Sequence, residues 1–423
     1  MAEAFGYWLK LGFVSFGGPA GQIAMMHQEL VEKRRWISEA RYLHALNYCM
    51  LLPGPEATQL ATYLGWLMHG VIGGIVAGVL FFLPSLLILI ALAWTYLAYG
   101  ALPLAAAVLW GVKPAVVAIV LYAAWRIGSR ALKHPLLWGF ALAAFVAIYF
   151  LGVGFPWIVG AAGLAGALLG RFRPALFGQG RPAPADDAAG PALIDDQTPT
   201  PAHARFSWRR LSATALAFVL IWSATLLLLD GSLRDMALFF TRAAFLTFGG
   251  AYAVLPYVYQ GGVEHYGWLT GPQMMDGLAL GETTPGPLIM VVAFVGYLGG
   301  VAKAILASGF WSGVAGAVTA TFFTFLPSFM FILLGGPLIE ASRGDLKFTA
   351  PLAGITAAVV GVIFNLAVFF AGHTFWPHGL ADGIDWPAAG LAVAAFVALW
   401  RFRLDILWVV GAAALIGLMR GLV

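Results

Sequence analysis

The stretch FGGPAGQIAMMHQELVEKRRWISEARYLHALNYCMLLPGPEATQL, residues 16–60, decides the fold because its framework occurs a second time, 232 positions later. The triplet FGG at residues 16–18 returns at 248–250, and the triplet PGP at 53–55 returns at 285–287. The spacing between the two triplets is the same in both copies, so this part of the match needs no gap. Self-similarity over so long a period indicates a duplicated unit.

Later motifs extend the repeat over most of the chain. FLPS at residues 82–85 corresponds to FLPS at 325–328, at a spacing of 243. AAFVA at 143–147 corresponds to AAFVA at 394–398, at a spacing of 251. Because the spacing grows in small steps, we interpret the chain as two homologous repeats that differ by short insertions.

The composition places the chain in a membrane. Of its 423 residues 61% are hydrophobic and 10% are charged, whereas water-soluble domains carry about 25% charged residues. The net charge of +4 is explained by basic loops that face the cytoplasm, so no nucleic-acid partner is expected. With Cys49 as the one cysteine, the sequence predicts neither an internal disulfide nor a metal site, and no cofactor.

The conserved spacing of the breaks within each copy suggests helices that do not cross the bilayer in one piece. Residues 4–16 are apolar but only about 20 Å long as a helix, against roughly 30 Å of hydrocarbon. Gly17-Gly18-Pro19 then ends the run, and the prolines of the triplet at 53–55 forbid a continuous helical ladder. We expect broken or re-entrant helical hairpins at these positions and at their counterparts in the second copy.

The fold class predicted from these patterns is an all-α polytopic membrane protein with two homologous, inverted-topology repeats that contain broken or re-entrant helices. Residues 171–210 are rich in arginine, proline and aspartate and are expected to form a disordered linker. The expected parts are the N-terminal repeat at 1–170, the linker at 171–210, a connecting transmembrane span at 211–231 and the C-terminal repeat at 232–423. In the first repeat we expect long spans at 71–99, 102–125, 136–151 and 156–169.

Loop charges predict the orientation. The loop at residues 33–41 contains Lys33, Arg34, Arg35 and Arg41, whereas its counterpart at 260–273 contains no lysine or arginine. By the positive-inside rule the first loop and the linker face the cytoplasm of a bacterium, with the chain in the inner membrane. Four full spans in each repeat, one connecting span and four hairpins place every loop on the side of the membrane that its charge predicts. Inverted repeats with broken helices are the architecture of secondary transporters.

Each break exposes backbone N–H groups at the start of the next half-helix, where they and the helix dipole can bind an anion. The alternative is that Gly and Pro merely allow close helix packing. Four paired breaks at fixed spacings favour the binding role. The candidate substrate-binding residues at the breaks are Gly17, Gly18, Gln22, Pro53, Gly54, Pro55, Gly249, Gly250, Thr283, Thr284, Pro285, Gly286 and Pro287.

Charged residues inside apolar segments are costly and normally functional. Lys10 and Arg242 lie six residues before the two FGG triplets, and Lys113 lies inside a long span, so all three are candidates that attract an anion. For Lys10 and Arg242 the alternative is snorkelling to the interface. Glu56 and Glu282 flank the PGP triplets and are candidates for proton coupling, with helix capping as the alternative for Glu56.

These motifs resemble those of the chromate ion transporter (CHR) family in its long two-domain form. The resemblance rests on FGGPAGQIAMMHQE, KRRWIS, LLPGPEATQLATYLGW and FFLPSLLIL in the first repeat. In the second it rests on FLTFGGAYAVLPYV, GWLTGPQMMDGLALGETTPGPLIMV and FLPSF. It implies efflux of chromate, with sulfate as the related oxyanion, driven by the electrochemical gradient, and hence a role in chromate resistance.

Other functions remain as alternatives. An oxyanion channel or an importer of the same architecture would share every motif. A lipid-modifying enzyme with Glu56 and Glu282 as acid and base lacks any accompanying nucleophile or metal motif, so the sequence predicts that the protein is not an enzyme. The expected partners are a chromate- or sulfate-type oxyanion and the lipid bilayer, and a homodimer is one form that the sequence allows.

Overall fold

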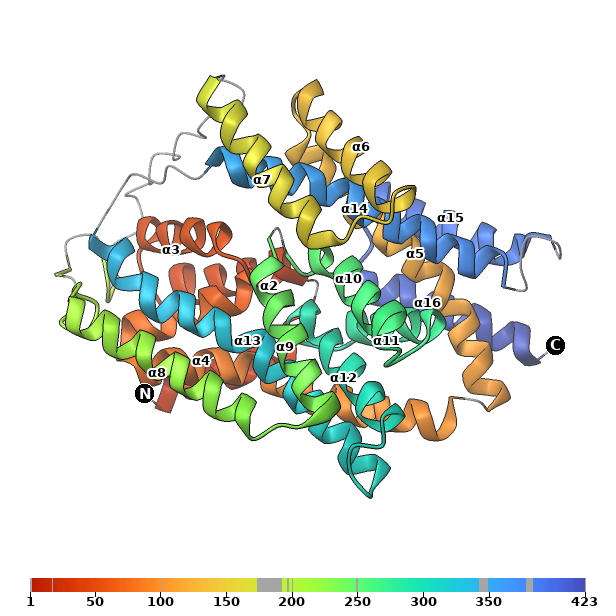
Figure 1. Ribbon diagram of the computed structural model, residues 1–423, viewed down its shortest axis with the longest axis horizontal. Coiled ribbons are helices and arrows are strands. Elements are labelled where there is room, and N and C mark those ends of the chain that lie inside the picture. The colour runs from red at the N-terminus through yellow and green to blue at the C-terminus, as the bar shows by residue number, and fades with distance from the viewer. Residues whose placement is uncertain are drawn as a thin grey trace.

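The computed structural model describes residues 2–16, 18–100, 102–172, 192–195, 198–199, 201–248, 250–341, 349–377 and 383–422. These residues are helical apart from turns and one β-bridge between Ile37 and Ile194 (Figure 1). The helices are α1 (Ala2–Val14), α2 (Gly18–His27), η1 (Gln28–Lys33), α3 (Glu39–Leu51), α4 (Glu56–Tyr99), α5 (Pro103–Ala131), α6 (Pro135–Tyr149), α7 (Phe155–Phe172), α8 (Trp208–Leu227), α9 (Gly231–Leu246), α10 (Ala251–Tyr259), η3 (Gln260–His265), α11 (Gly271–Thr283), η4 (Leu288–Met290), α12 (Val291–Ala302), α13 (Gly309–Ala341), α14 (Thr349–Phe375), α15 (Trp386–Trp400) and α16 (Ile406–Leu422).

Six of the described helices are long and apolar enough to cross a membrane: α4, α5, α7, α8, α13 and α14. A crossing helix needs about 20 predominantly apolar residues, because only a helix satisfies its backbone hydrogen bonds within lipid. The chain is therefore an all-α, multi-pass membrane protein, as its composition predicts.

Two of the segments expected to be full spans form helices that are short for a membrane crossing. The segment expected at 136–151 forms α6, and its counterpart forms α15, each with 15 residues. Such a helix is about 22 Å long, less than the roughly 30 Å of hydrocarbon. Pro135 fixes the start of α6, and the chain turns at Gly152, which has φ +61°.

The first break of each half interrupts a helix at the glycine pair. In the first half α1 ends at Val14 and α2 begins at Gly18, and in the second α9 ends at Leu246 and α10 begins at Ala251. Gly18 has φ +71° and Gly250 has φ +92°, a backbone region that other residues rarely adopt. Gly17 and Gly249, also expected at the breaks, lie outside the described residues.

The second break of each half lies at the PGP triplet. Helix α3 ends at Leu51 and α4 begins directly after Pro55, while α11 ends at Thr283 and η4 begins directly after Pro287. The central glycines, Gly54 and Gly286, have φ +129° and +106°. Each triplet therefore forms a tight, non-helical tip between two helices, which we call the Pro-Gly-Pro tip.

Helix α4 consists of two antiparallel parts, because its backbone turns back at His69 and Gly70. A Cβ at Gly73 would lie within 2.4 Å of the carbonyl oxygen of Gly65, which shows how closely the two parts pack. In the second half α12 and α13 form the same antiparallel pair, with Gly296 against Gly316. Small residues allow this close approach of helix backbones.

The two halves interlock through exchanged helices. Helix α5 of the first half packs on α15 and α16 of the second, and α14 of the second packs on α6 and α7 of the first (Figure 1). Helices α4 and α13 are in contact at the centre of this exchange, where the rings of Phe82 and Phe325 stack with centroids 4.4 Å apart. These phenylalanines occupy equivalent places in the two FLPS motifs.

Part of the segment expected to be a disordered linker is bound to the first half. Leu193 N–H donates to the carbonyl oxygen of Arg35 at 2.9 Å, and Ile194 pairs in both directions with Trp36 and Ser38 at 3.1 and 3.0 Å. These contacts were not expected, because the sequence analysis predicted disorder over 171–210. Residues 173–191 of the segment lie outside the described part of the chain.

Candidate functional site

Each Pro-Gly-Pro tip is hydrogen-bonded to the glycine break of the other half of the chain. The N–H of Gly54 donates to the carbonyl oxygen of Thr247 at 2.7 Å, and the N–H of Gly286 donates to that of Ser15 at 2.9 Å. Thr247 and Ser15 are equivalent residues, each directly before an FGG triplet. The two bonds are thus related by the duplication, and they join the four breaks in two equivalent pairs.

A serine packs against the central glycine of each tip. A Cβ at Gly286 would lie 2.7 Å from the Cβ of Ser85, and a Cβ at Gly54 would lie 2.6 Å from the hydroxyl oxygen of Ser328. Both serines end an FLPS motif. The sequence analysis used this motif to trace the repeat but did not place it at the site. The signal that could have found the serines is a polar residue at equivalent positions of two apolar spans.

Two glutamines fix the backbone of the tips. The Nε2 amide of Gln22, a predicted site residue, donates to the carbonyl oxygen of Gly286 at 2.6 Å and to that of Ser15 at 3.3 Å. The Nε2 amide of Gln59 donates to the carbonyl oxygen of Pro53 at 2.7 Å. Because these carbonyl oxygens accept hydrogen bonds, their partial negative charge repels an anion less strongly.

Four buried hydroxyl groups around the tips lack a partner within the described residues: those of Ser15, Thr58, Ser85 and Ser328. Buried polar groups are nearly always hydrogen-bonded, and an unpaired one costs about 1–3 kcal/mol. A hydroxyl can rotate to donate to an oxygen atom. The arrangement can therefore bind a small ligand rich in oxygen, or ordered water.

The three predicted cations lie in two different settings. Lys10 on α1 and Arg242 on α9 have exposed side chains, so the structure does not place them among the buried residues of the tips. Lys113 on α5 is partly buried, and its Nζ lies 3.7 Å from Oδ1 of Asp276. The positive charge of Lys113 is thus already balanced by a carboxylate.

Asp276 on α11 is a buried charged residue that the sequence analysis missed. It accepts a hydrogen bond at Oδ2 from the Tyr96 hydroxyl at 2.9 Å, in addition to its ion pair with Lys113. The signal was present in the sequence, because an aspartate within an apolar helix is costly unless it has a partner. Tyr96 and Lys113 come from α4 and α5, so the carboxylate joins three helices.

The two candidate proton-coupling residues differ in their contacts. Glu282 accepts a hydrogen bond from the hydroxyl of Tyr252, which lies just after the glycine break of the second half. Glu56 is the first residue of α4, is half-buried and has no hydrogen bond or ion pair within the described residues. Thr283 and Thr284 donate to carbonyl oxygens of their own helix, α11, which leaves their hydroxyl protons engaged.

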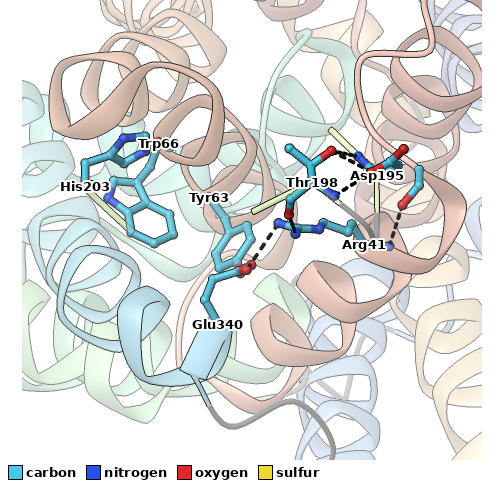
Figure 2. A network of polar contacts seen from close by, with 8 residues as sticks. Arg41, Tyr63, Trp66, Asp195, Thr198, His203 and Glu340 are labelled. Atoms are coloured by element: carbon cyan, nitrogen blue, oxygen red, sulfur yellow. Dashed lines mark hydrogen bonds and ion pairs between the residues drawn. The ribbon is translucent and has the colours of Figure 1, made fainter. Parts of the chain in front are cut away.

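A second buried charge network lies apart from the tips and was also missed. Nη1 of Arg41 lies 3.3 Å from the Glu340 carboxylate, and both side chains are about 95% buried, with exposures of 5% and 4%. The Tyr63 hydroxyl donates to the same carboxylate at 2.5 Å. Figure 2 shows the guanidinium of Arg41 also reaching the carbonyl oxygen of Thr198, at 2.8 Å. The network joins α3, α4 and α13 to the linker.

The basic loop outside the membrane-spanning helices is held by ion pairs. Arg34 contacts Glu3 at 2.6 Å and Glu29 at 2.8 Å, and its guanidinium lies 4.9 Å from the centre of the Trp36 ring. The hydrogen bond from Arg34 holds the pKa of the Glu29 carboxyl below its usual range. These contacts fix the start of α1 over η1.

Long apolar helices packed around broken ones, with unpaired buried hydroxyls where the breaks meet, define a multi-pass membrane protein built around an internal polar site. Comparison with known sequences narrows this class. The chain belongs to the chromate transporter family, which it matches over residues 2–167 and 234–418. The resemblance inferred from its motifs is therefore confirmed.

Three relatives match almost the whole chain. It is 32% identical to the chromate transport protein of Cupriavidus metallidurans over 98% of this chain and 91% of that protein. It is 35% identical to the chromate transport protein of Pseudomonas aeruginosa, with the same two coverages of 98% and 91%. A probable chromate transport protein of Synechococcus elongatus is 30% identical over 93% of this chain and 88% of that protein. These proteins are transporters and not enzymes, and no solved structure is significantly similar to the chain.

Proposed function

We propose that the protein is a secondary transporter that exports chromate across the bacterial inner membrane, and that the oxyanion binds at the two Pro-Gly-Pro tips. The observation that carries this proposal is the set of unpaired buried hydroxyls on Ser15, Ser85 and Ser328 around the tips. We infer the identity of the substrate from the relatives, which are chromate transport proteins. Sulfate is a tetrahedral dianion of similar size, and we expect it to compete for the same donors.

Binding a dianion at the tips requires donors that replace its water. An unpaired charge is very costly to bury, whereas each hydrogen bond to a charged group contributes about 1.5–3 kcal/mol. The donors in our proposal are the three serine hydroxyls and the free N–H groups in the first turn of α4, after Pro55. Gln22 and Gln59 support the site indirectly, since they hold the tip carbonyl oxygens.

The reciprocal bonds from Gly54 to Thr247 and from Gly286 to Ser15 support two repeats of inverted topology. Helix α8 adds one crossing between the repeats, which would turn the second upside down relative to the first. The basic loop at 33–41 and the linker would then face the cytoplasm, and the loop at 260–273 would face outward. In this arrangement the tips meet near the midplane, where inverted-repeat transporters bind their substrates.

The direction of transport follows from the charge of the substrate. Moving a dianion out of a cell that is negative inside releases about 4.6 kcal/mol at 100 mV, twice the value for one charge. This could sustain an outward gradient of roughly a thousandfold, so a coupled proton is not required. Glu56, which has no partner within the described residues, and Glu282, which is bound to Tyr252, remain our candidates if protons are coupled.

The test is chromate uptake into inside-out vesicles at fixed pH, with an imposed electrical potential and with sulfate as competitor. We expect saturable uptake that is driven by an inside-positive potential and reduced by sulfate. Uptake that does not saturate and only dissipates a gradient would favour a channel, and uptake only into right-side-out vesicles would favour an importer. Absence of uptake by folded protein in both orientations would refute chromate as the substrate.

A further inference from the structure

A pocket of about 370 Å³ lies apart from the tips, where the end of the linker meets α8. Its size is within the usual range for sites of small molecules, roughly 300–1,000 Å³. The linker and the start of α8 contribute His203, Arg205, Ser207 and Arg210 to one side. The remaining lining is mostly apolar and includes Trp66, Val71, Leu211, Ala213, Leu333 and Pro337.

We propose that this pocket binds the phosphate-bearing headgroup of an anionic phospholipid, whose acyl chains then lie along α8. The proposal does not depend on the transported substrate. It rests on how the polar side is built, on its positive charge and on its position at the end of a membrane-spanning helix.

Hydrogen bonds hold the polar side of the pocket in shape. Nε2 of His203 lies 2.9 Å from the carbonyl oxygen of Trp66, and the two rings meet edge to face, with centroids 5.8 Å apart (Figure 2). The guanidinium of Arg210 donates to the carbonyl oxygen of Ala202. Two adjacent linker residues, Ala202 and His203, are thus bound to α8 and to α4, and these bonds hold the linker beside the pocket.

The polar side carries positive charge suited to a phosphate. Arg205 and Arg210 both line the pocket, and guanidinium groups match the geometry of phosphate oxygens. Ser207 is the N-cap of α8, but its side chain makes no capping hydrogen bond. The N–H groups of the first turn of α8 are therefore left for another acceptor, at the positive end of the helix dipole.

The pocket lies at the depth expected for lipid headgroups. Helix α8 is long and apolar enough to cross the membrane, and its one buried residue is Leu226. It lies along the outside of α13 (Figure 1), so most of its length faces lipid. Trp208 at its start is 75% exposed, which is typical of a residue at the membrane interface. Basic pockets at such helix ends bind anionic headgroups.

A free phosphate ion would share the basic side of the pocket but would leave the apolar side unused. Val71, Leu211 and Leu333 offer no partner to an inorganic ion, whereas they suit the glycerol and upper acyl region of a lipid. The whole lining therefore favours a phospholipid.

The experiment measures lipid retention by native mass spectrometry on the full-length, delipidated protein. Phosphatidylglycerol, phosphatidylcholine with the same acyl chains, and inorganic phosphate are added separately and in competition. We expect the protein to retain phosphatidylglycerol in preference to phosphatidylcholine, and inorganic phosphate not to displace it. The double variant Arg205→Gln/Arg210→Gln is expected to lower retention by roughly tenfold or more, the effect of losing a charge-assisted bond.

The matched control is Arg209→Gln, which removes a neighbouring positive charge that does not line the pocket and should leave retention unchanged. If the double variant does not fold, Ala213→Phe provides an independent test, because it fills the apolar side and keeps both arginines. Equal retention of phosphatidylglycerol by the wild type and the pocket variants would overturn the proposal. Equal retention of phosphatidylcholine, or displacement by inorganic phosphate, would overturn the assignment to an anionic lipid.

Discussion

At the scale of single residues, the glycines of the two tips have the most restrictive environments. Gly54 and Gly286 combine a positive φ with a serine packed against the position of the missing side chain. Strain at such a backbone position costs about 1–3 kcal/mol, and overpacking costs about as much again. No residue with a side chain fits either position without moving a neighbour.

We therefore predict that Gly54→Ala and Gly286→Ala each lower the free energy of unfolding by about 2 kcal/mol or more. Thermal unfolding of the purified protein in detergent measures the effect. Gly139→Ala and Gly390→Ala are the matched controls, because their helical positions have open space around them. These two should be neutral or slightly stabilising. A loss no larger at Gly54 than at Gly139 would contradict the tip geometry.

The residues that could be predicted from the sequence are those that change the conformation of their own backbone. The Gly-Gly and Pro-Gly-Pro motifs disfavour a continuous helix through their own backbone, so the four breaks could be predicted from the sequence, although a single proline such as Pro84 lies inside a helix. Ser85 and Ser328 could not be assigned in this way, because each lies more than two hundred positions from the glycine that it contacts. Likewise Lys113 was predicted to supply positive potential, but its partner, Asp276, comes from another helix and balances its charge.

At the scale of helices, a buried ion pair fastens α3 to α13. Arg41 and Glu340 are both almost fully buried. Removing one partner of a buried pair leaves an uncompensated charge and costs about 3–5 kcal/mol. Replacing both partners with apolar residues of similar size is often close to neutral.

We predict that Glu340→Ala destabilises the protein by about 3–5 kcal/mol. The double variant Arg41→Met/Glu340→Leu should recover most of this loss. A double-mutant cycle on the unfolding free energies, completed by the single variants Arg41→Met and Glu340→Leu, measures the coupling. Equal destabilisation of Glu340→Ala and the double variant would show that the buried charge is not the cause.

The length of a helix is less predictable than its existence. An apolar run such as 136–151 reads as a full span, yet α6 has only 15 residues. Pro135 and the turn at Gly152 set its ends, and whether such signals end a helix depends on the packing around them. The start of the second part of α4, in contrast, agrees with the span expected at 71–99, since the structure turns at His69 and Gly70.

At the scale of the whole molecule, the duplication was visible in the sequence but the exchange of helices was not. Motif spacing identifies equivalent segments, and equivalent hydrogen bonds recur in the structure at Gly54 and Gly286. The packing of α5 on α15 and α16, and of α14 on α6 and α7, depends on surface complementarity between distant segments. Periodicity along a chain carries no information about such partners.

The proposed inverted topology predicts that equivalent loop residues face opposite sides of the membrane. Glu32 and Glu264 are equivalent and both are exposed. In a Cys49→Ser background, Glu32→Cys should react with an impermeant thiol reagent only from the cytoplasmic side. Glu264→Cys should react only from the periplasmic side. Reaction of both from the same side would exclude the inverted arrangement.

The central claim is that the Pro-Gly-Pro tips and their serines bind the transported oxyanion. The most direct test is the initial rate of chromate uptake into inside-out vesicles, measured against concentration for the wild type and the double variant Ser85→Ala/Ser328→Ala. Ser129→Ala, an exposed serine on α5, is the control. We predict that the double variant, at equal protein level, has a KM raised by roughly tenfold or more, because hydrogen bonds to a charged ligand are lost. An unchanged KM and rate in the double variant would contradict the proposed site.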